Sequence, residues 1–170
     1  MNVSEYIFDE LAKHVDTVFF LPGGGANFLV DALGRSGLKA VAMLHEQGAG
    51  YAAVGYAMHK GLGVCLVTSG PGATNAITPC LAAWMDSVPV VFISGQVRTD
   101  KLAKGRQRFN GVQEGPTFAM VRPITKDAVI MQNGNVSRIA NLIELAKDRR
   151  MGPVWIDVPQ DVQAMEAIHA

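Results

Sequence analysis

The chain is 170 residues long, which fits one domain with an ordinary buried core. It is 49% hydrophobic and only 18% charged, so part of the apolar material could cover a partner interface instead of a core. The formal net charge is zero, which gives no sign of a nucleic-acid partner. The longest apolar runs, such as residues 88–93, are too short to span a bilayer, and the N-terminus lacks signal-peptide features. We therefore expect a cytoplasmic protein with no membrane partner.

Short apolar runs alternate with helical patterns along the chain. The predicted helices cover residues 3–13, a segment from the glycines at 23–25 to about 33, 46–59, a segment after 72 to about 85, and 136–148. The predicted strands cover residues 17–21, 39–44, 63–68, 89–94, 127–131 and 153–158. The strands are continuous apolar runs, as expected when helices cover both faces of a parallel sheet. The sequence therefore predicts a three-layer α/β/α sandwich with a six-stranded parallel sheet.

Three strand-to-helix junctions carry unusual motifs, at residues 21–25, 44–48 and 68–75. In a parallel α/β sheet these junctions lie at the carboxyl edge of the strands, where ligands bind. Glycines there let the backbone approach a ligand and expose amides at helix starts. Neither glycine loop has a dinucleotide or P-loop pattern, which disfavours a Rossmann-type oxidoreductase. Tight turns without a ligand remain the alternative for each loop taken alone.

Glu46 closes an apolar strand and opens a helix whose following residues are mostly small. Small residues there let another group pack against the helix. A carboxylate that only caps the helix start is the alternative, and spacing alone favours it.

The segment 98–115 has little apolar periodicity and carries Lys101, Lys104, Arg106 and Arg108. This composition favours a solvated loop. Long loops after strands of α/β domains often carry function, so we also consider it a candidate active-site loop.

Cys65 and Cys80 lie in apolar runs without a second ligand at metal spacing, so we expect buried thiols and no metal site on this chain. Pro79 falls inside the predicted helix after residue 72 and should kink or loosen it.

Taken together, the motifs form a collinear series. In chain order they are PGG (22–24), HEQGAGYAAVGYA (45–57), TSGPGATNAITP (68–79), DSVPVVFISGQV (86–97), VQEGP (112–116), RPITK (122–126) and GPVWIDVPQDVQ (152–163). From residue 18 to 163 the chain resembles the N-terminal, pyrimidine-binding domain of acetolactate synthase and related thiamine-diphosphate (ThDP) decarboxylases and ligases.

The resemblance implies that Glu46 is both catalytic and cofactor-binding. The matching glutamate hydrogen-bonds a ring nitrogen of the cofactor's aminopyrimidine and stabilises its imino tautomer, whose exocyclic nitrogen removes the thiazolium C2 proton. The cofactor itself supplies the ylid and the electron sink.

The resemblance also implies roles for residues at the glycine loops and in the loop after the fourth strand. The implied cofactor-binding residues, besides Glu46, are Pro22, Gly23, Gly24, Ser69, Gly70, Pro71, Gly72 and Asn75, the last five being near the dimer interface. The implied substrate-pocket residues are Gly24 and Gln113. Acetolactate synthases carry phenylalanine just before this glutamine, whereas this chain has Val112, and Phe109 could substitute for it from the loop. The acceptor and the 2-keto acid therefore remain open.

Enzymes of this kind anchor the cofactor's diphosphate through Mg²⁺, held by a GDG motif and later asparagines in a separate C-terminal domain. This chain contains no GDG. We therefore expect residues 1–170 to be a single pyrimidine-binding domain, with the middle and diphosphate-binding domains elsewhere. It would be a natural small subunit or a piece of a longer enzyme, inactive alone.

The partner would be a second copy or a chain with the diphosphate-binding domain, in a homodimer or a hetero-oligomer. The expected reaction is decarboxylation of a 2-keto acid with carboligation or release of the aldehyde. The alternative from another class is a non-catalytic assembly module. Nothing here supports FAD, which some relatives bind in the middle domain.

Overall fold

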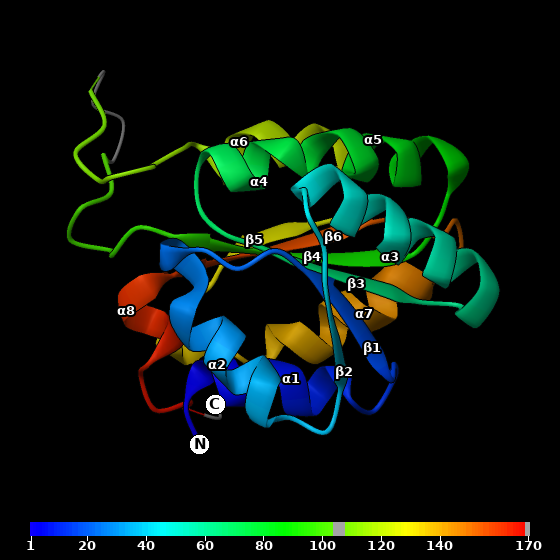
Figure 1. The fold of residues 1–170 in the computed structure, drawn as a ribbon, viewed down its shortest axis with the longest axis horizontal. Coiled ribbons are helices and arrows are strands. Elements are labelled where there is room, and N and C mark those ends of the chain that lie inside the picture. The colour runs from blue at the N-terminus through cyan, green and yellow to red at the C-terminus, as the bar shows by residue number, and fades with distance from the viewer. Residues whose placement is uncertain (104–107, 169–170) are drawn as a thin grey trace.

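The computed structural model describes residues 1–103 and 108–168. In this part of the chain, a six-stranded parallel sheet with strand order β2-β1-β3-β4-β6-β5 lies between two layers of helices (Figure 1). The strands are β1 (Thr17–Phe20), β2 (Lys39–Ala42), β3 (Gly63–Val67), β4 (Val90–Gln96), β5 (Ala128–Ile130) and β6 (Val154–Pro159). The helices are α1 (Val3–Leu11), α2 (Asn27–Arg35), α3 (Glu46–Lys60), α4 (Pro71–Asn75), α5 (Ile77–Asp86), α6 (Thr117–Val121), α7 (Arg138–Lys147) and α8 (Gln160–Gln163). Short 3-10 turns cover Gly24–Ala26, Arg122–Ile124 and Asn133–Asn135. The predicted three-layer sandwich is confirmed.

Each face of the sheet has its own hydrophobic core. One core packs α1, α2 and α7 against side chains such as Val64 and Leu66. The other packs α3, α5 and α6 against the alternate residues, such as Cys65 and Val67. Successive strand residues point to opposite faces, which explains why these strands are apolar throughout. Cys65 and Cys80 are both buried free thiols, and burial raises the pKa of each.

The predicted helix after residue 72 is divided in two. Helix α4 ends at Asn75 and α5 begins at Ile77. Pro79 lacks an N–H, and a proline ring crowds the carbonyl four residues earlier, here that of Asn75. The loosening expected from Pro79 is therefore seen. A Cβ added to Gly50 of α3 would lie 2.3 Å from Pro79 Cγ, so the small residues of α3 allow α5 to pack closely.

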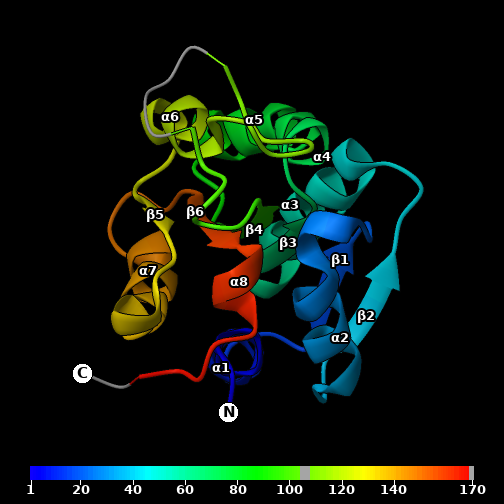
Figure 2. The ribbon, with the colours of Figure 1, turned by 90° about the vertical axis from the view of Figure 1, so that its left-hand side faces the viewer.

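The strand order positions the candidate site. The chain leaves β1 for β2 on one side, while β3 pairs with β1 on the other. In open α/β sheets, ligands bind at the carboxyl ends of strands where the order reverses in this way. Figure 2 views the molecule from the side of this edge, with α8 in front. Within the described residues, none of the helices has both the length and the apolar character needed to cross a bilayer.

Candidate functional site

The glycine turn after β1 packs directly on the end of β3. A Cβ added to Gly23 would lie 2.5 Å from Thr68 Cβ, and one added to Gly25 would lie 2.4 Å from Ser69 Oγ. The Gly25 N–H donates to Thr68 Oγ1 at 3.1 Å. Only glycine allows approaches this close, so two of the predicted junctions meet at the switch point.

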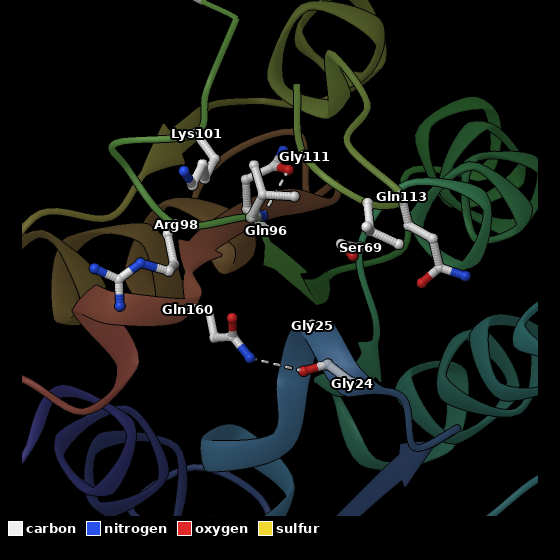
Figure 3. A pocket seen from close by; sticks show the side chains of 11 residues that line it. Gly24, Gly25, Ser69, Gln96, Arg98, Lys101, Gly111, Gln113 and Gln160 are labelled. Atoms are coloured by element: carbon white, nitrogen blue, oxygen red, sulfur yellow. Dashed lines mark hydrogen bonds between the residues drawn. The ribbon is translucent and has the colours of Figure 1, made fainter. Parts of the chain in front are cut away.

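Helix α8 holds the same turn from the other side. Gln163 Nε2 donates to the Gly25 carbonyl at 2.7 Å. Gln160 Nε2 donates to the Gly24 carbonyl at 3.2 Å (Figure 3). A Cβ added to Gly24 would have no neighbour within 4 Å, so this residue faces open space. Both glutamines belong to the motif at residues 152–163, but the resemblance implies no role for them.

Glu46 begins α3, and His45 caps the helix by accepting the Gln47 N–H at Nδ1 over 3.1 Å. Asn75 Nδ2 donates to Glu46 Oε2 at 2.9 Å. No described residue donates to the other oxygen, Oε1. The half-buried carboxylate is therefore fixed through one oxygen and available through the other.

Thr68 lies between Glu46 and the glycine turn. A Cβ added to Gly72 would lie 2.6 Å from Thr68 Cγ2 and 3.2 Å from Glu46 Oε1. Thr68 also contacts Gly23 and Gly25, as described above. The structure thus brings Glu46, Gly72 and Asn75 together with the glycine turn, through a threonine that the sequence analysis did not single out.

Two of the predicted cofactor-binding residues are exposed prolines. Pro71 is exposed and occupies the first position of α4, where the missing N–H costs no hydrogen bond. Pro22 is also exposed and precedes Gly23.

Gln113 approaches the site from the loop after β4. A Cβ added to Gly70, whose φ is +53°, would lie 2.2 Å from the Gln113 carbonyl oxygen. Gln113 itself has a φ of +58°. Gln113, Gly24 and Ser69 line one pocket of about 340 Å³ (Figure 3). The two residues predicted for the substrate pocket therefore lie together.

Glu114 fastens this loop. Its Oε1 accepts the Ala103 N–H at 2.6 Å, and its Oε2 accepts the N–H groups of Asn110 and Gly111 at 3.0 and 3.1 Å. Burial raises the pKa of Glu114, but the three hydrogen bonds outweigh it and leave the pKa below its ordinary value.

The start of the loop is fastened by Asp161, which accepts the N–H and the hydroxyl of Thr99 at 3.0 and 2.5 Å. Two of the loop's basic residues, Arg98 and Lys101, line the pocket with Gln113. Lys104 and Arg106 lie outside the described residues. The candidate loop therefore borders the site.

A buried acid at the ends of β4 and β6 was missed by the sequence analysis. Asp157 accepts the Ser94 hydroxyl at 2.7 Å and Gln96 Nε2 at 3.1 Å, while Trp155 Nε1 donates to Ser94 Oγ at 2.8 Å. Burial raises the pKa of Asp157 to about 7, against the opposing effect of these hydrogen bonds.

Asp157 and Gln96 border a second, largely apolar cavity of about 450 Å³ that Phe109 also lines. Phe109 does not line the pocket that contains Gln113. Phe109 therefore does not take the place of the phenylalanine that the resemblance predicts just before Gln113.

These features define an α/β domain with a half-buried carboxylate, Glu46, that is linked through Thr68 to a glycine turn at the switch point of the sheet. Among the described residues, no cluster of three or more His, Cys, Asp or Glu side chains could hold a metal ion.

Comparison with known proteins assigns the family. Residues 1–115 match the family described as "Thiamine pyrophosphate enzyme, N-terminal TPP binding domain". The chain belongs to this family, as the collinear motifs predicted.

Similar curated proteins are acetolactate synthases. The acetolactate synthase large subunit of Corynebacterium glutamicum is 43% identical over 157 residues, which is 90% of this chain and 24% of that protein. The acetolactate synthase isozyme 2 large subunit of Escherichia coli is 41% identical over 167 residues, or 96% and 30% of the two chains. The mitochondrial acetolactate synthase catalytic subunit of Saccharomyces cerevisiae is 42% identical over 164 residues, or 93% and 23%. The chain thus spans about a quarter of the length of these relatives.

Proposed function

We propose that this chain is the pyrimidine-binding half of a ThDP-dependent enzyme that decarboxylates a 2-keto acid, with carboligation or release of the aldehyde. The single observation that carries the proposal is the hydrogen bonding of the Glu46 carboxylate. One carboxylate oxygen accepts the Asn75 amide at 2.9 Å, and the other has no donor among the described residues. The family and the named relatives support the same reaction class.

The residues present fit the pyrimidine half of the cofactor. Gly72 leaves the space beside Glu46 Oε1 without a side chain, and Gly24 faces open space. A carboxyl group can share a proton with a ring nitrogen, while Asn75 holds its orientation. When bound, the cofactor would supply the C2 carbanion and the electron sink.

The remaining cofactor residues position the backbone around this carboxylate. Pro22, Gly23 and Gly24 would border the pyrimidine and the substrate. Ser69, Gly70, Pro71 and Gly72 would shape the opposite wall. Gln113 would line the substrate entrance, because it shares a pocket with Gly24.

An exposed apolar face supports the need for a partner. Tyr51 and Met58 on α3, and Leu81 and Met85 on the neighbouring α5, are between 41% and 69% exposed. An apolar patch of this kind is typical of a protein interface. We propose that it meets a diphosphate-binding domain, from a second copy or another chain, and that this domain holds the Mg²⁺. No residue described here argues for FAD.

The substrate is proposed to be a 2-keto acid. Val112 is 89% exposed and lines the pocket beside Gln113, where the resemblance predicts a larger phenylalanine.

The test is co-expression with a chain that carries a GDG diphosphate motif. The assembled protein should bind ThDP with Mg²⁺ and decarboxylate a 2-keto acid, and Glu46→Gln should abolish the decarboxylation without preventing assembly. An assembly that forms but binds no cofactor would instead support a non-catalytic assembly module.

A further inference from the structure

One wall of the pocket beside Gly24 is cationic. Arg98 and Lys101 line it on the side opposite Ser69 and Gln113 (Figure 3). Arg98 pairs with Asp100 at 3.1 Å, and both side chains of this pair are 56% exposed. An ion pair exposed to water holds its partners weakly. Within residues 1–103 and 108–168, the Lys101 ammonium has no acidic partner, so both cations can receive a ligand.

The nearby acids do not line the pocket. None of the described residues that line the pocket is acidic. Glu114 is occupied by three backbone N–H groups, and Asp161 is occupied by Thr99. Among the described residues, the charged side chains that line the pocket, Arg98 and Lys101, are therefore both cationic.

The other side of the pocket is neutral. Ser69 and Gln113 lie there, and the backbone of Gly24 borders it. Gly24 is proposed above to border both the pyrimidine and the substrate, so the reacting end of the substrate would lie on this side. A bound molecule that spans the pocket would thus have one end near Gly24 and the other near Lys101.

The volume favours a ligand longer than pyruvate. At about 340 Å³, the pocket falls in the range that accommodates molecules much larger than a three-carbon acid. Pyruvate bound at the Gly24 end would leave Arg98 and Lys101 hydrated and without a ligand.

We propose that this pocket selects a 2-keto acid that carries a second anionic group, a carboxylate or a phosphate, at the end remote from the keto group. The reacting end lies at Gly24 and Gln113, and the second anion binds Arg98 and Lys101. A guanidinium matches the geometry of either oxyanion, and the lysine adds a point charge. The inference rests on the proposed function and specifies its substrate class.

The test compares two five-carbon acids that differ in one charged group. 2-Oxoglutarate and 2-oxopentanoate are titrated into the 170-residue chain, without thiamine, and binding is followed by the NMR shifts of the amides that line the pocket. We expect 2-oxoglutarate to bind about tenfold more tightly at low salt, with the preference falling as salt is raised. Competition by inorganic phosphate shows whether the anionic end also accepts a phosphate group.

Substitutions then assign the preference to the cationic wall. Arg98→Gln and Lys101→Gln should each reduce it, and the double variant should bind both acids equally. Lys39→Gln is the matched control, because Lys39 is an exposed lysine on the edge strand β2. Unchanged binding of 2-oxopentanoate shows that each variant is folded.

Equal binding of the two acids by the wild-type chain, or a preference that survives in the double variant, would overturn the inference. This outcome leaves the role of Glu46 untouched, because that role is measured by cofactor proton exchange. A preference for 2-oxoglutarate in a protein whose exchange does not depend on Glu46 would overturn the proposed function instead.

Discussion

Asn75 Nδ2 donates a 2.9 Å hydrogen bond to Glu46 Oε2 and so joins the end of α4 to the start of α3. The two residues are 29 positions apart and come from different motifs. Because the carboxylate is half-buried and held at one oxygen, its other oxygen is presented in a fixed direction. Such preorganisation is what a proton-sharing group requires.

Asn75→Ala removes this bond while leaving the carboxylate. In the assembled enzyme we expect the C2-proton exchange of ThDP to slow by about tenfold or more, because a hydrogen bond to a charged group contributes about 1.5–3 kcal/mol. The measurement is deuterium exchange followed by NMR. Thr74→Ala, at the exposed neighbouring position, should exchange at the wild-type rate. Equal rates in both variants would show that Asn75 does not orient Glu46.

Gly70→Ala should destabilise the fold. The residue has φ +53°, and an added Cβ would lie 2.2 Å from the Gln113 carbonyl oxygen. The backbone conformation alone should cost about 1–3 kcal/mol in the free energy of unfolding, measured in urea. Gly34→Ala on α2 is the control, because a Cβ added to Gly34 would have no neighbour within 4 Å. That variant should be more stable by about 0.5–1 kcal/mol, and a stabilised Gly70→Ala would contradict the structure.

Glu114→Gln should release the loop after β4. Only one of the two terminal groups of glutamine can accept a hydrogen bond, so an N–H of Ala103, or those of Asn110 and Gly111, loses its partner. We expect faster hydrogen exchange at these amides, equivalent to a local loss of about 2 kcal/mol. Hydrogen exchange in β3 should not change. Unaltered protection of the Ala103 and Gly111 amides would show that Glu114 does not hold the loop.

Asp157 should make stability depend on pH. Burial raises the pKa of Asp157 to about 7 from an ordinary value of 3.8, so the folded chain holds an extra proton between these values. The contribution of Asp157 to the free energy of unfolding is therefore greatest below pH 3.8. It falls as the pH rises towards 7, so the protein becomes less stable over this range. Asp157→Asn should lack this decline, because an amide does not titrate in this range. Urea titrations from pH 4 to 8 test it, and an identical slope in both proteins would rule it out.

The regular elements were predictable from the sequence because they depend on local pattern. The buried parallel strands read as continuous apolar runs, and Pro79 indicated the break between α4 and α5. The site was predictable in part, because its glycines and Glu46 belong to contiguous motifs. These motifs also led to the family, which the comparisons confirm for residues 1–115.

Residues that reach the site from elsewhere could not be predicted. Gln160 and Gln163 hold the glycine turn across more than 130 positions of sequence, and Asp157 is buried by packing that no local pattern reveals. Phe109 shows that closeness in sequence does not ensure closeness in space. It is close to Gln113 in sequence, yet it lines a different cavity.

The central claim is that Glu46 assists formation of the thiamine ylid. It is tested most directly by the rate of C2-proton exchange of ThDP in the assembled enzyme, with Glu46→Gln compared with wild type. We expect the variant to lose about a hundredfold or more in rate, as is usual when a proton-transfer group is removed. Glu144→Gln, at an exposed glutamate of α7, should match the wild type. An unchanged exchange rate in Glu46→Gln would contradict the account.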